Sequence, residues 1–209
     1  MADADLRGKF ITLEGVDGAG KSTHVAWIAE RLKTGGREVV VTREPGGTRL
    51  AEKLRALVLA EPMDPLSETL LMFAARADHV QEVIAPALAR GAWVVCDRFT
   101  DSTFAYQVHG RQFSLAVIEQ LEQWVLGSLQ PDLTLWFDLP PAMAAGRLAD
   151  ARSPDRFELE QTAFFERVRD GYAQRAATHP ARFVCIDALG SRQEIWQRVK
   201  DALARAKQR

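Results

Sequence analysis

The chain has 209 residues, of which 47% are hydrophobic and 26% are charged. This composition is typical of a soluble globular protein and excludes wholesale disorder. Lys and Arg (27) nearly balance Asp and Glu (28), giving a net charge of −1. The bulk charge therefore gives no reason to expect a nucleic acid or a membrane surface as a partner.

Short apolar, β-branched segments alternate with longer segments of helical period along the chain. Strands are predicted at residues 9–14, 38–43, 93–97, 133–139 and 182–187. Several are apolar at nearly every position, as expected for strands covered on both faces. The alternation predicts a three-layer α/β fold: a roughly five-stranded parallel sheet with helices on both faces, in one domain over residues 1–209.

Helices between these strands are predicted from apolar residues spaced three and four apart. A proline at position 86 predicts that its helix is kinked or ends a turn early. The apolar stripes are Val25, Ile28, Ala29 and Leu32; Leu50, Leu54, Leu57 and Val58; Val80, Val83, Ile84 and Ala87; and Ile195, Val199 and Leu203.

The two cysteines, Cys96 and Cys185, lie far apart in apolar runs, without the spacing of a metal site. They are expected to be small buried hydrophobic residues in a reducing compartment. No apolar stretch approaches the ~18 residues of a membrane span, and residues 1–9 lack the apolar core of a secretory signal. These features predict a cytoplasmic protein.

A glycine loop at residues 15–22 (GVDGAGKS) fits the pattern G-x-x-x-x-G-K-[ST] directly after the first predicted strand. Its backbone N–H groups and the N-terminus of the following helix attract phosphates. Lys21 is expected to reach the outer phosphates of ATP, and Ser22 to bind Mg²⁺. The predicted ATP-binding residues are Gly15, Val16, Asp17, Gly18, Ala19, Gly20, Lys21, Ser22 and Thr23.

Two further features concern the reaction. The chain contains no asparagine, which disfavours a switch GTPase with its Asn-Lys-x-Asp guanine clamp. The third predicted strand ends at Asp97, which can hold Mg²⁺ through water. Arg98 follows where many hydrolases place a water-activating glutamate. An arginine there predicts a second phosphate group rather than a water nucleophile.

Six segments of the chain together resemble bacterial thymidylate kinases, in order and spacing. They are GVDGAGKST, REPGGT (43–48), LLMFAARADH (70–79), DRFTDST (97–103), AYQ (105–107) and PDLTLWFDL (131–139). The resemblance implies a P-loop nucleoside monophosphate kinase that transfers the γ-phosphoryl group of ATP to dTMP. It also implies dTDP as the product for DNA synthesis, Mg²⁺ as cofactor and a homodimer.

The same resemblance implies a set of contacts to dTMP. Arginines meet the acceptor phosphate, a phenylalanine stacks on thymine, and the remaining residues line the base and the deoxyribose. The residues are Asp17, Arg43, Pro45, Phe73, Arg76, Arg98, Thr103, Tyr106 and Gln107. From the residues alone, a charged Arg76 inside an apolar segment is expected to meet an anion or a carboxylate.

The catalytic residues predicted are Lys21, Arg98 and Asp17, with Arg152 and Arg156. The last two flank Pro154 in the charged segment 149–160, which the resemblance implies is a lid that delivers positive charge to the transferring group. Some thymidylate kinases carry that charge on an arginine in the glycine loop, where this chain has Gly18. A role for Asp17 as general base is left open.

Two alternative functions remain at this stage. The acceptor could be dUMP, UMP or a nucleoside, or the chain could be a regulatory module that binds ATP without turnover. Residues 108–111 (VHGR) replace the glycine-rich run of many bacterial relatives, so contacts beyond Gln107 stay open.

Overall fold

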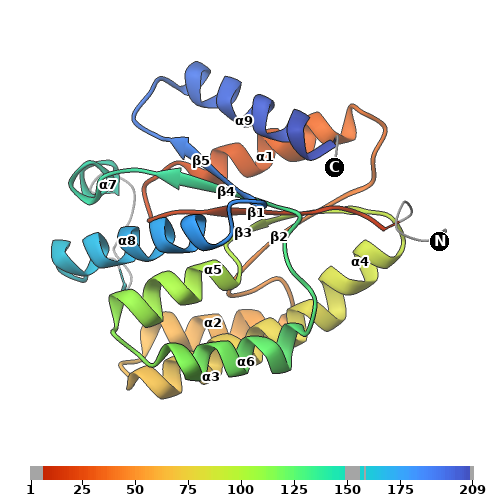
Figure 1. The fold of residues 1–209 in the computed structure, drawn as a ribbon. Helices are drawn as coiled ribbons and strands as arrows, with labels where there is room; N and C mark the ends of the chain where they lie inside the picture. Colours follow the sequence, from red (N-terminus) through yellow and green to blue (C-terminus); the bar gives the residue numbers. More distant parts are fainter. Residues whose placement is uncertain (1–6, 149–155, 158, 208–209) are drawn as a thin grey trace.

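The five strands of the computed structural model form one parallel sheet in the order β2-β3-β1-β4-β5 (Figure 1). The structure describes residues 7–148, 156–157 and 159–207. Every predicted strand is confirmed to within one residue at each end. The strands are β1 (Phe10–Glu14), β2 (Val39–Arg43), β3 (Trp93–Asp97), β4 (Leu133–Asp138) and β5 (Phe183–Asp187).

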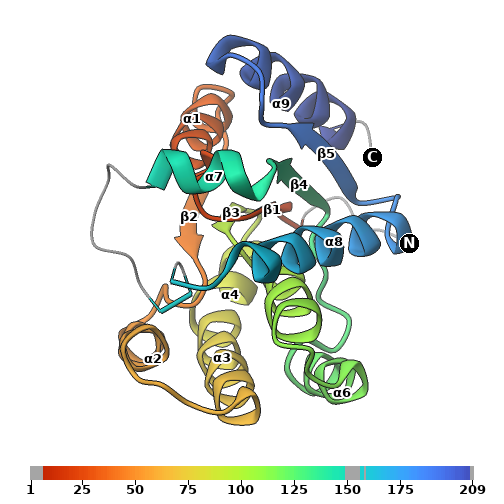
Figure 2. The same cartoon turned by 90° about the vertical axis from the view of Figure 1, so that its left-hand side faces the viewer.

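Helices cover both faces of this sheet, which confirms the three-layer α/β fold (Figures 1 and 2). One face carries α1 (Lys21–Lys33) and α9 (Arg192–Lys207). The other carries α4 (Ala85–Ala89), α5 (Thr100–Thr103) and α8 (Thr162–Thr178), with α7 (Pro141–Leu148) packed on α8. Farther from the sheet lie α2 (Arg49–Ala60), α3 (Pro65–His79) and α6 (Leu115–Leu126). Within the part of the chain described, no helix is long and apolar enough to cross a membrane.

Local chemistry explains where several helices begin. The Thr48 side chain accepts a hydrogen bond from the Ala51 N–H and caps α2. Asp64 caps α3 through the N–H groups of Leu66 and Ser67, just before a proline at the first helical position. Such caps satisfy N–H groups that would otherwise lack a helical partner, and each stabilises its helix by about 1 kcal/mol.

The sequence predicts that Pro86 either kinks its helix or ends it a turn early. The helix does not end early. The helix runs on from α3 through a π-type segment, η1 (Val80–Ile84), and continues as α4. Proline lacks an N–H group and collides with the carbonyl four residues back, so a widened turn just before it is the expected response. A second π-type segment, η2 (Phe104–Gly110), follows α5.

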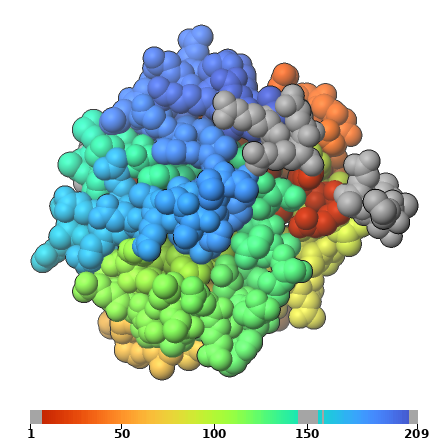
Figure 3. Space-filling view, in the orientation of Figure 1, coloured from red at the N-terminus to blue at the C-terminus, as the bar shows by residue number. Residues whose placement is uncertain are grey.

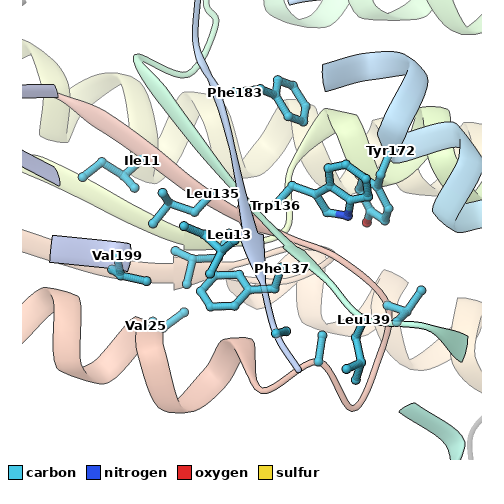
Figure 4. Close-up of a cluster of buried hydrophobic side chains, with 14 of the residues drawn as sticks. Ile11, Leu13, Val25, Leu135, Trp136, Phe137, Leu139, Tyr172, Phe183 and Val199 are labelled. Atoms are coloured by element: carbon cyan, nitrogen blue, oxygen red, sulfur yellow. The ribbon is translucent and has the colours of Figure 1, made fainter. Parts of the chain in front are cut away.

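The main core lies where β1 and β4 meet the helices above and below the sheet (Figure 4). Leu135 and Phe137 are fully buried among α1 and α9 side chains, whereas Trp136 points to the opposite face beside Tyr172. Burial of each such side chain stabilises the fold by about 1.5–3 kcal/mol. This core holds the carboxyl ends of the central strands rigidly in place.

Two sequence-based expectations about burial are wrong. Leu50 and Leu57 are about half exposed, and α2 buries Ala51 and Val58 instead, because this outer helix packs chiefly against α3. Cys185 is exposed, since β5 is an edge strand with one neighbour. Cys96, on the interior strand β3 between β2 and β1, is buried as predicted.

Candidate active site

The glycine loop joins β1, the central strand, to α1. Gly15 has φ 135° and lies so close to β4 that a Cβ would stand 2.5 Å from the Phe137 carbonyl oxygen. Gly20 adopts the left-handed conformation that starts α1 at Lys21. Both positions therefore require glycine, and the loop is held against the sheet at the carboxyl ends of the strands, where ligands bind in open α/β folds.

Lys21 is nearly buried at the start of α1. Its Nζ donates to the carbonyl oxygens of Gly15 and Val16, both at 2.9 Å. Burial, reinforced by the nearby Arg98 charge, lowers the pKa of Lys21 to about 8. The ammonium group is thus held over the loop by weak neutral acceptors, for which a phosphate oxygen is a stronger replacement.

Ser22 and Asp97 face each other across the end of the sheet. Ser22 Oγ donates to Asp97 Oδ2 at 3.1 Å, and Asp97 Oδ1 is buried with no hydrogen-bond partner among the described residues. An orphaned carboxylate oxygen beside a hydroxyl suits a hydrated Mg²⁺, which takes few protein ligands and keeps several waters. The residues described include no cluster of three or more His, Cys, Asp or Glu side chains that could form a full protein cage.

Arg98 follows Asp97 and has φ 69°, an uncommon backbone conformation for a residue with a side chain. Its Nη2 donates to Asp17 Oδ1 at 2.8 Å and to the Tyr106 hydroxyl at 3.0 Å. Burial alone would raise the pKa of Asp17, but the charges of Arg98 and Lys21 outweigh it and hold that pKa well below its usual range. The glycine loop and the end of β3 are therefore tied by a charged pair.

These elements line a cleft of about 890 Å³, which is large enough for nucleotide-sized ligands. It is walled by the glycine loop, the segment after β2 and the start of η2. The predicted residues that line it are Asp17, Gly18, Gly20, Lys21, Ser22, Thr23, Arg43, Pro45, Asp97, Arg98, Tyr106 and Gln107. Gly15, Val16 and Ala19 do not line it; the side chains of Val16 and Ala19 are part of the core.

Arg43 ends β2 at the outer rim of the cleft. Both carboxylate oxygens of Glu52 accept from its Nη2, at 3.1 and 3.0 Å. The Arg43 side chain is 57% exposed, so the pair can exchange partners at little cost. Arg55 reaches across from α2 and donates to the Pro45 carbonyl at 2.9 Å.

Three of the predicted dTMP contacts lie behind the cleft wall. Arg76 is 2% exposed, and its Nε donates to Glu44 Oε2 at 2.7 Å, so the expected carboxylate is present. Its Nη2 donates to Thr103 Oγ1, and its guanidinium covers the Phe73 ring at 4.8 Å. Arg76 Nη1 is buried and has no partner within the described ranges.

Segment 149–160 falls largely outside the described residues, and Arg152 is among those left out. Arg156 is described, and it is not among the residues that line the cleft. Its Nη2 donates to the buried Glu68 at 2.6 Å, and its Nε donates to the Val58 carbonyl. Gln107 Nε2 also donates to Glu68, at 2.7 Å. The next residue, Phe157, lines the cleft.

Sequence reasoning missed a group of residues behind Arg98. Glu14 is fully buried at the end of β1, and burial, together with the charge of Asp101, raises its pKa to about 7. It accepts hydrogen bonds from the Phe99 N–H, the Ser102 hydroxyl and the Tyr172 hydroxyl. The sequence could have indicated Glu14, because a carboxylate at the end of an apolar strand is unusual. Nothing in the sequence around Tyr172 distinguishes it from other residues of an amphipathic helix.

Comparison with known proteins gives a consistent result. The family model described as thymidylate kinase matches residues 13–199. The chain is 62% identical over 182 residues to the thymidylate kinase of Bordetella petrii, covering 87% of this chain and 88% of that protein. It is 57% identical over 203 residues to that of Ralstonia nicotianae, covering 95% and 99%. A crystal structure of thymidylate kinase from Ehrlichia chaffeensis superimposes with a TM-score of 0.75 at 35% identity, over 93% of this chain and 98% of that one.

Proposed function

The chain belongs to the thymidylate kinase family, whose members transfer the γ-phosphoryl group of ATP to dTMP, and we propose how its cleft performs this reaction. In this proposal the cleft beside the glycine loop holds ATP and dTMP end to end. The observation that carries this proposal is the convergence of Lys21, Arg98 and Arg43 on one cleft, each on a different element. A triphosphate and a monophosphate repel each other at about 4 kcal/mol per unit charge pair at 4 Å, with an effective dielectric constant of 20. Fixed cations offset that repulsion.

On the donor side, the loop residues Gly15 to Thr23 cradle the phosphates of ATP. Lys21 exchanges its two carbonyl partners for phosphate oxygens. Ser22 and Asp97 would hold Mg²⁺, Ser22 through its hydroxyl and Asp97 through water. When bound, Mg²⁺ supplies positive charge to the phosphate oxygens and helps to orient them.

On the acceptor side, Arg98 and Arg43 contact the phosphate of dTMP, with Pro45 in the adjoining turn. Asp17 accepts from the 3′-hydroxyl, and Tyr106 and Gln107 line the deoxyribose. Arg76, Phe73 and Thr103 form the base side of the site, and the free Nη1 of Arg76 supports a polar contact there. Because Phe73 and Thr103 lie behind the wall, this side requires a small opening when dTMP binds.

The remaining charge on the transferring group comes from segment 149–160, which we propose closes as a lid over ATP. Arg152 and Arg156 are the residues proposed to carry this charge. Arg156 must then leave Glu68, and the described position of Phe157 in the cleft wall supports a segment that reaches the site.

We also propose one domain over residues 1–209 that works as a homodimer in the cytoplasm. The helices α2, α3 and α6 pack side by side (Figure 1), and α6, in green, forms part of the molecular surface in Figure 3. Large exposed apolar side chains on these helices support the dimer. They are 45% to 72% exposed: Leu50, Leu57, Leu66, Leu70, Leu115 and Trp124. The exposed thiol of Cys185 supports a reducing compartment, and the balanced charge supports partners that are nucleotides and not nucleic acids or membranes.

The test is an ADP-release assay with Mg-ATP and a panel of acceptors: dTMP, dUMP, UMP, CMP, AMP and GMP. We expect dTMP to give the highest kcat/KM. We also expect Lys21→Ala to reduce turnover by several orders of magnitude while circular dichroism shows an intact fold. Near-normal turnover in that variant would contradict the assignment of the loop, and ATP binding without dTMP-dependent ADP would indicate a regulatory module.

A further inference from the structure

Arg98 is held by more than its ion pair with Asp17. Its Nη1 donates to the Ser102 hydroxyl at 3.2 Å and to the Tyr172 hydroxyl at 3.0 Å, while Nη2 donates to Asp17 and Tyr106. These four contacts account for all four Nη hydrogens. The left-handed backbone of Arg98 is strained, so the residue depends on its surroundings to keep this conformation.

Tyr172 differs from the other three partners because it does not line the cleft. Asp17, Ser102 and Tyr106 all do, whereas Tyr172 is fully buried on α8, with its ring stacked on Trp136 at 6.3 Å (Figure 4). A group without surface in the cleft cannot touch a substrate. Any effect of its hydroxyl on the reaction must pass through Arg98 or Ser102.

The hydrogen bonds around Tyr172 have a defined direction. Arginine is only a donor, so the Tyr172 oxygen accepts from Arg98 and its proton must point elsewhere. Two acceptors are in reach, Ser102 Oγ at 2.8 Å and Glu14 Oε2 at 3.1 Å. Ser102 itself donates to Glu14 Oε2 at 2.6 Å. In its ionised form Glu14 is only an acceptor, so it ends the chain of donors and keeps the Tyr172 lone pairs turned toward Arg98.

A neutral oxygen is well suited to hold the Arg98 guanidinium in place. Burial raises the pKa of the Tyr172 hydroxyl, which therefore stays uncharged. A second carboxylate next to Arg98 would cancel the positive charge that the acceptor phosphate needs. The tyrosine fixes the guanidinium in place and leaves that charge to the ligand.

We propose that Tyr172, oriented by Glu14, is a positioning residue that aligns Arg98 with the phosphate of dTMP. This inference rests on the proposed contact between Arg98 and that phosphate. It assigns a function to a helix, α8, that follows segment 149–160 and contributes no described residue to the cleft wall.

The central test is Tyr172→Phe, which removes one oxygen and keeps the ring on Trp136. Loss of a buried hydrogen bond to a charged group predicts a fall of about tenfold to a hundredfold in kcat/KM for dTMP. The KM for ATP should stay within about twofold, because the loop and Lys21 are untouched. In an Arg98→Ala background, Tyr172→Phe should have no further effect, as expected for a residue that acts through another.

A matched control is Thr12→Val, which breaks a buried hydroxyl pair with Thr134 (3.0 Å) in the sheet and removes no hydrogen bond to the Arg98 side chain. It should lower the Tm and leave the dTMP kinetics unchanged. If Arg98→Ala does not fold, Arg98→Lys takes its place in the cycle. If Tyr172→Phe does not fold, Glu14→Gln serves as the second variant, with a loss of the same kind in kcat/KM for dTMP.

The outcomes separate the inference from the proposed function. Wild-type kinetics in Tyr172→Phe, or an equal loss with and without Arg98, would overturn the positioning role while leaving Arg98 in the site. Wild-type dTMP kinetics in Arg98→Ala would overturn the proposed phosphate contact itself, and the inference with it.

Discussion

At the scale of single residues, three of the arginines predicted to contact dTMP are already paired with carboxylates. Arg98 pairs with Asp17, Arg43 with Glu52, and Arg76 with Glu44. Unpaired buried cations would be costly, so these carboxylates stabilise the protein when no substrate is bound. Phosphate groups must compete with them. The exposed pair Arg43–Glu52 should exchange most readily, and the buried pair Arg76–Glu44 least.

Glu14 gives a prediction about pH. Its pKa is raised from 4.5 to about 7, chiefly by burial, so between these values the folded state holds a proton that the unfolded state has released. This group therefore favours the folded state most below pH 4.5, and the advantage is lost as the pH rises through 7. The shift corresponds to about 3 kcal/mol. Urea unfolding of Glu14→Gln from pH 5 to 8 should show a free energy of unfolding that falls less with pH than in the wild type, by roughly this amount.

The control for this prediction is Glu30→Gln on the exposed surface of α1. Its side chain faces solvent, so the pH dependence should match that of the wild type. Equal slopes for Glu14→Gln and the wild type would show that the Glu14 carboxyl titrates alike in both states.

At the scale of elements, helix α8 is fitted closely against η2. A Cβ at Gly171 would stand 2.9 Å from the Ala105 Cα and 2.8 Å from the His109 ring. The backbone at Ala105 cannot move easily, so a methyl group at position 171 would collide with it. The free-energy cost of this collision should exceed the roughly 1 kcal/mol by which alanine stabilises a helix relative to glycine. Gly171→Ala should therefore lower the stability by about 1–2 kcal/mol. It should also lower kcat/KM for dTMP, because the neighbouring Tyr172 moves with the helix.

Thermal unfolding and dTMP kinetics measure both effects. Gly190→Ala is the comparison, since its closest neighbour is the flexible end of the exposed Glu194 side chain. A Gly171→Ala protein as stable as the wild type, with unchanged kinetics, would mean that α8 can shift freely.

The elements also show what the sequence could and could not predict. Residues 15–22 alone predict Lys21, and the end of the third strand predicts Asp97 and Arg98. Arg43 was added by the family resemblance, and all four residues line one cleft. The contact between Glu14 and Tyr172 joins residues 158 positions apart, and no local pattern indicates it. The predicted burial of Leu50 and Leu57 on α2 was wrong. The helical spacing of apolar residues shows which side of a helix is apolar, but not whether another element covers that side.

At the scale of the whole molecule, the layer formed by α2, α3 and α6 gives the prediction about assembly. A stable interface buries about 1,200–2,000 Å² in total and is enriched in aromatic side chains, and the exposed leucines and Trp124 supply such a surface. Placing a lysine in its middle would bury an unpaired charge. If the proposed dimer uses this surface, Leu70→Lys, on α3 between the two flanking helices, should make the protein sediment as a monomer in sedimentation velocity experiments.

The matched control is Leu189→Lys, an equally exposed leucine (53%, against 48% for Leu70) that follows β5 and lies outside these helices. It should sediment as the wild type does. A wild type that sediments as a monomer at micromolar concentration would contradict the dimer, and a Leu70→Lys protein that remains dimeric would move the interface to another face. Because Leu70 precedes the motif residues Phe73 and Arg76 on the same helix, monomers should also show a higher KM for dTMP if the partner subunit steadies that helix.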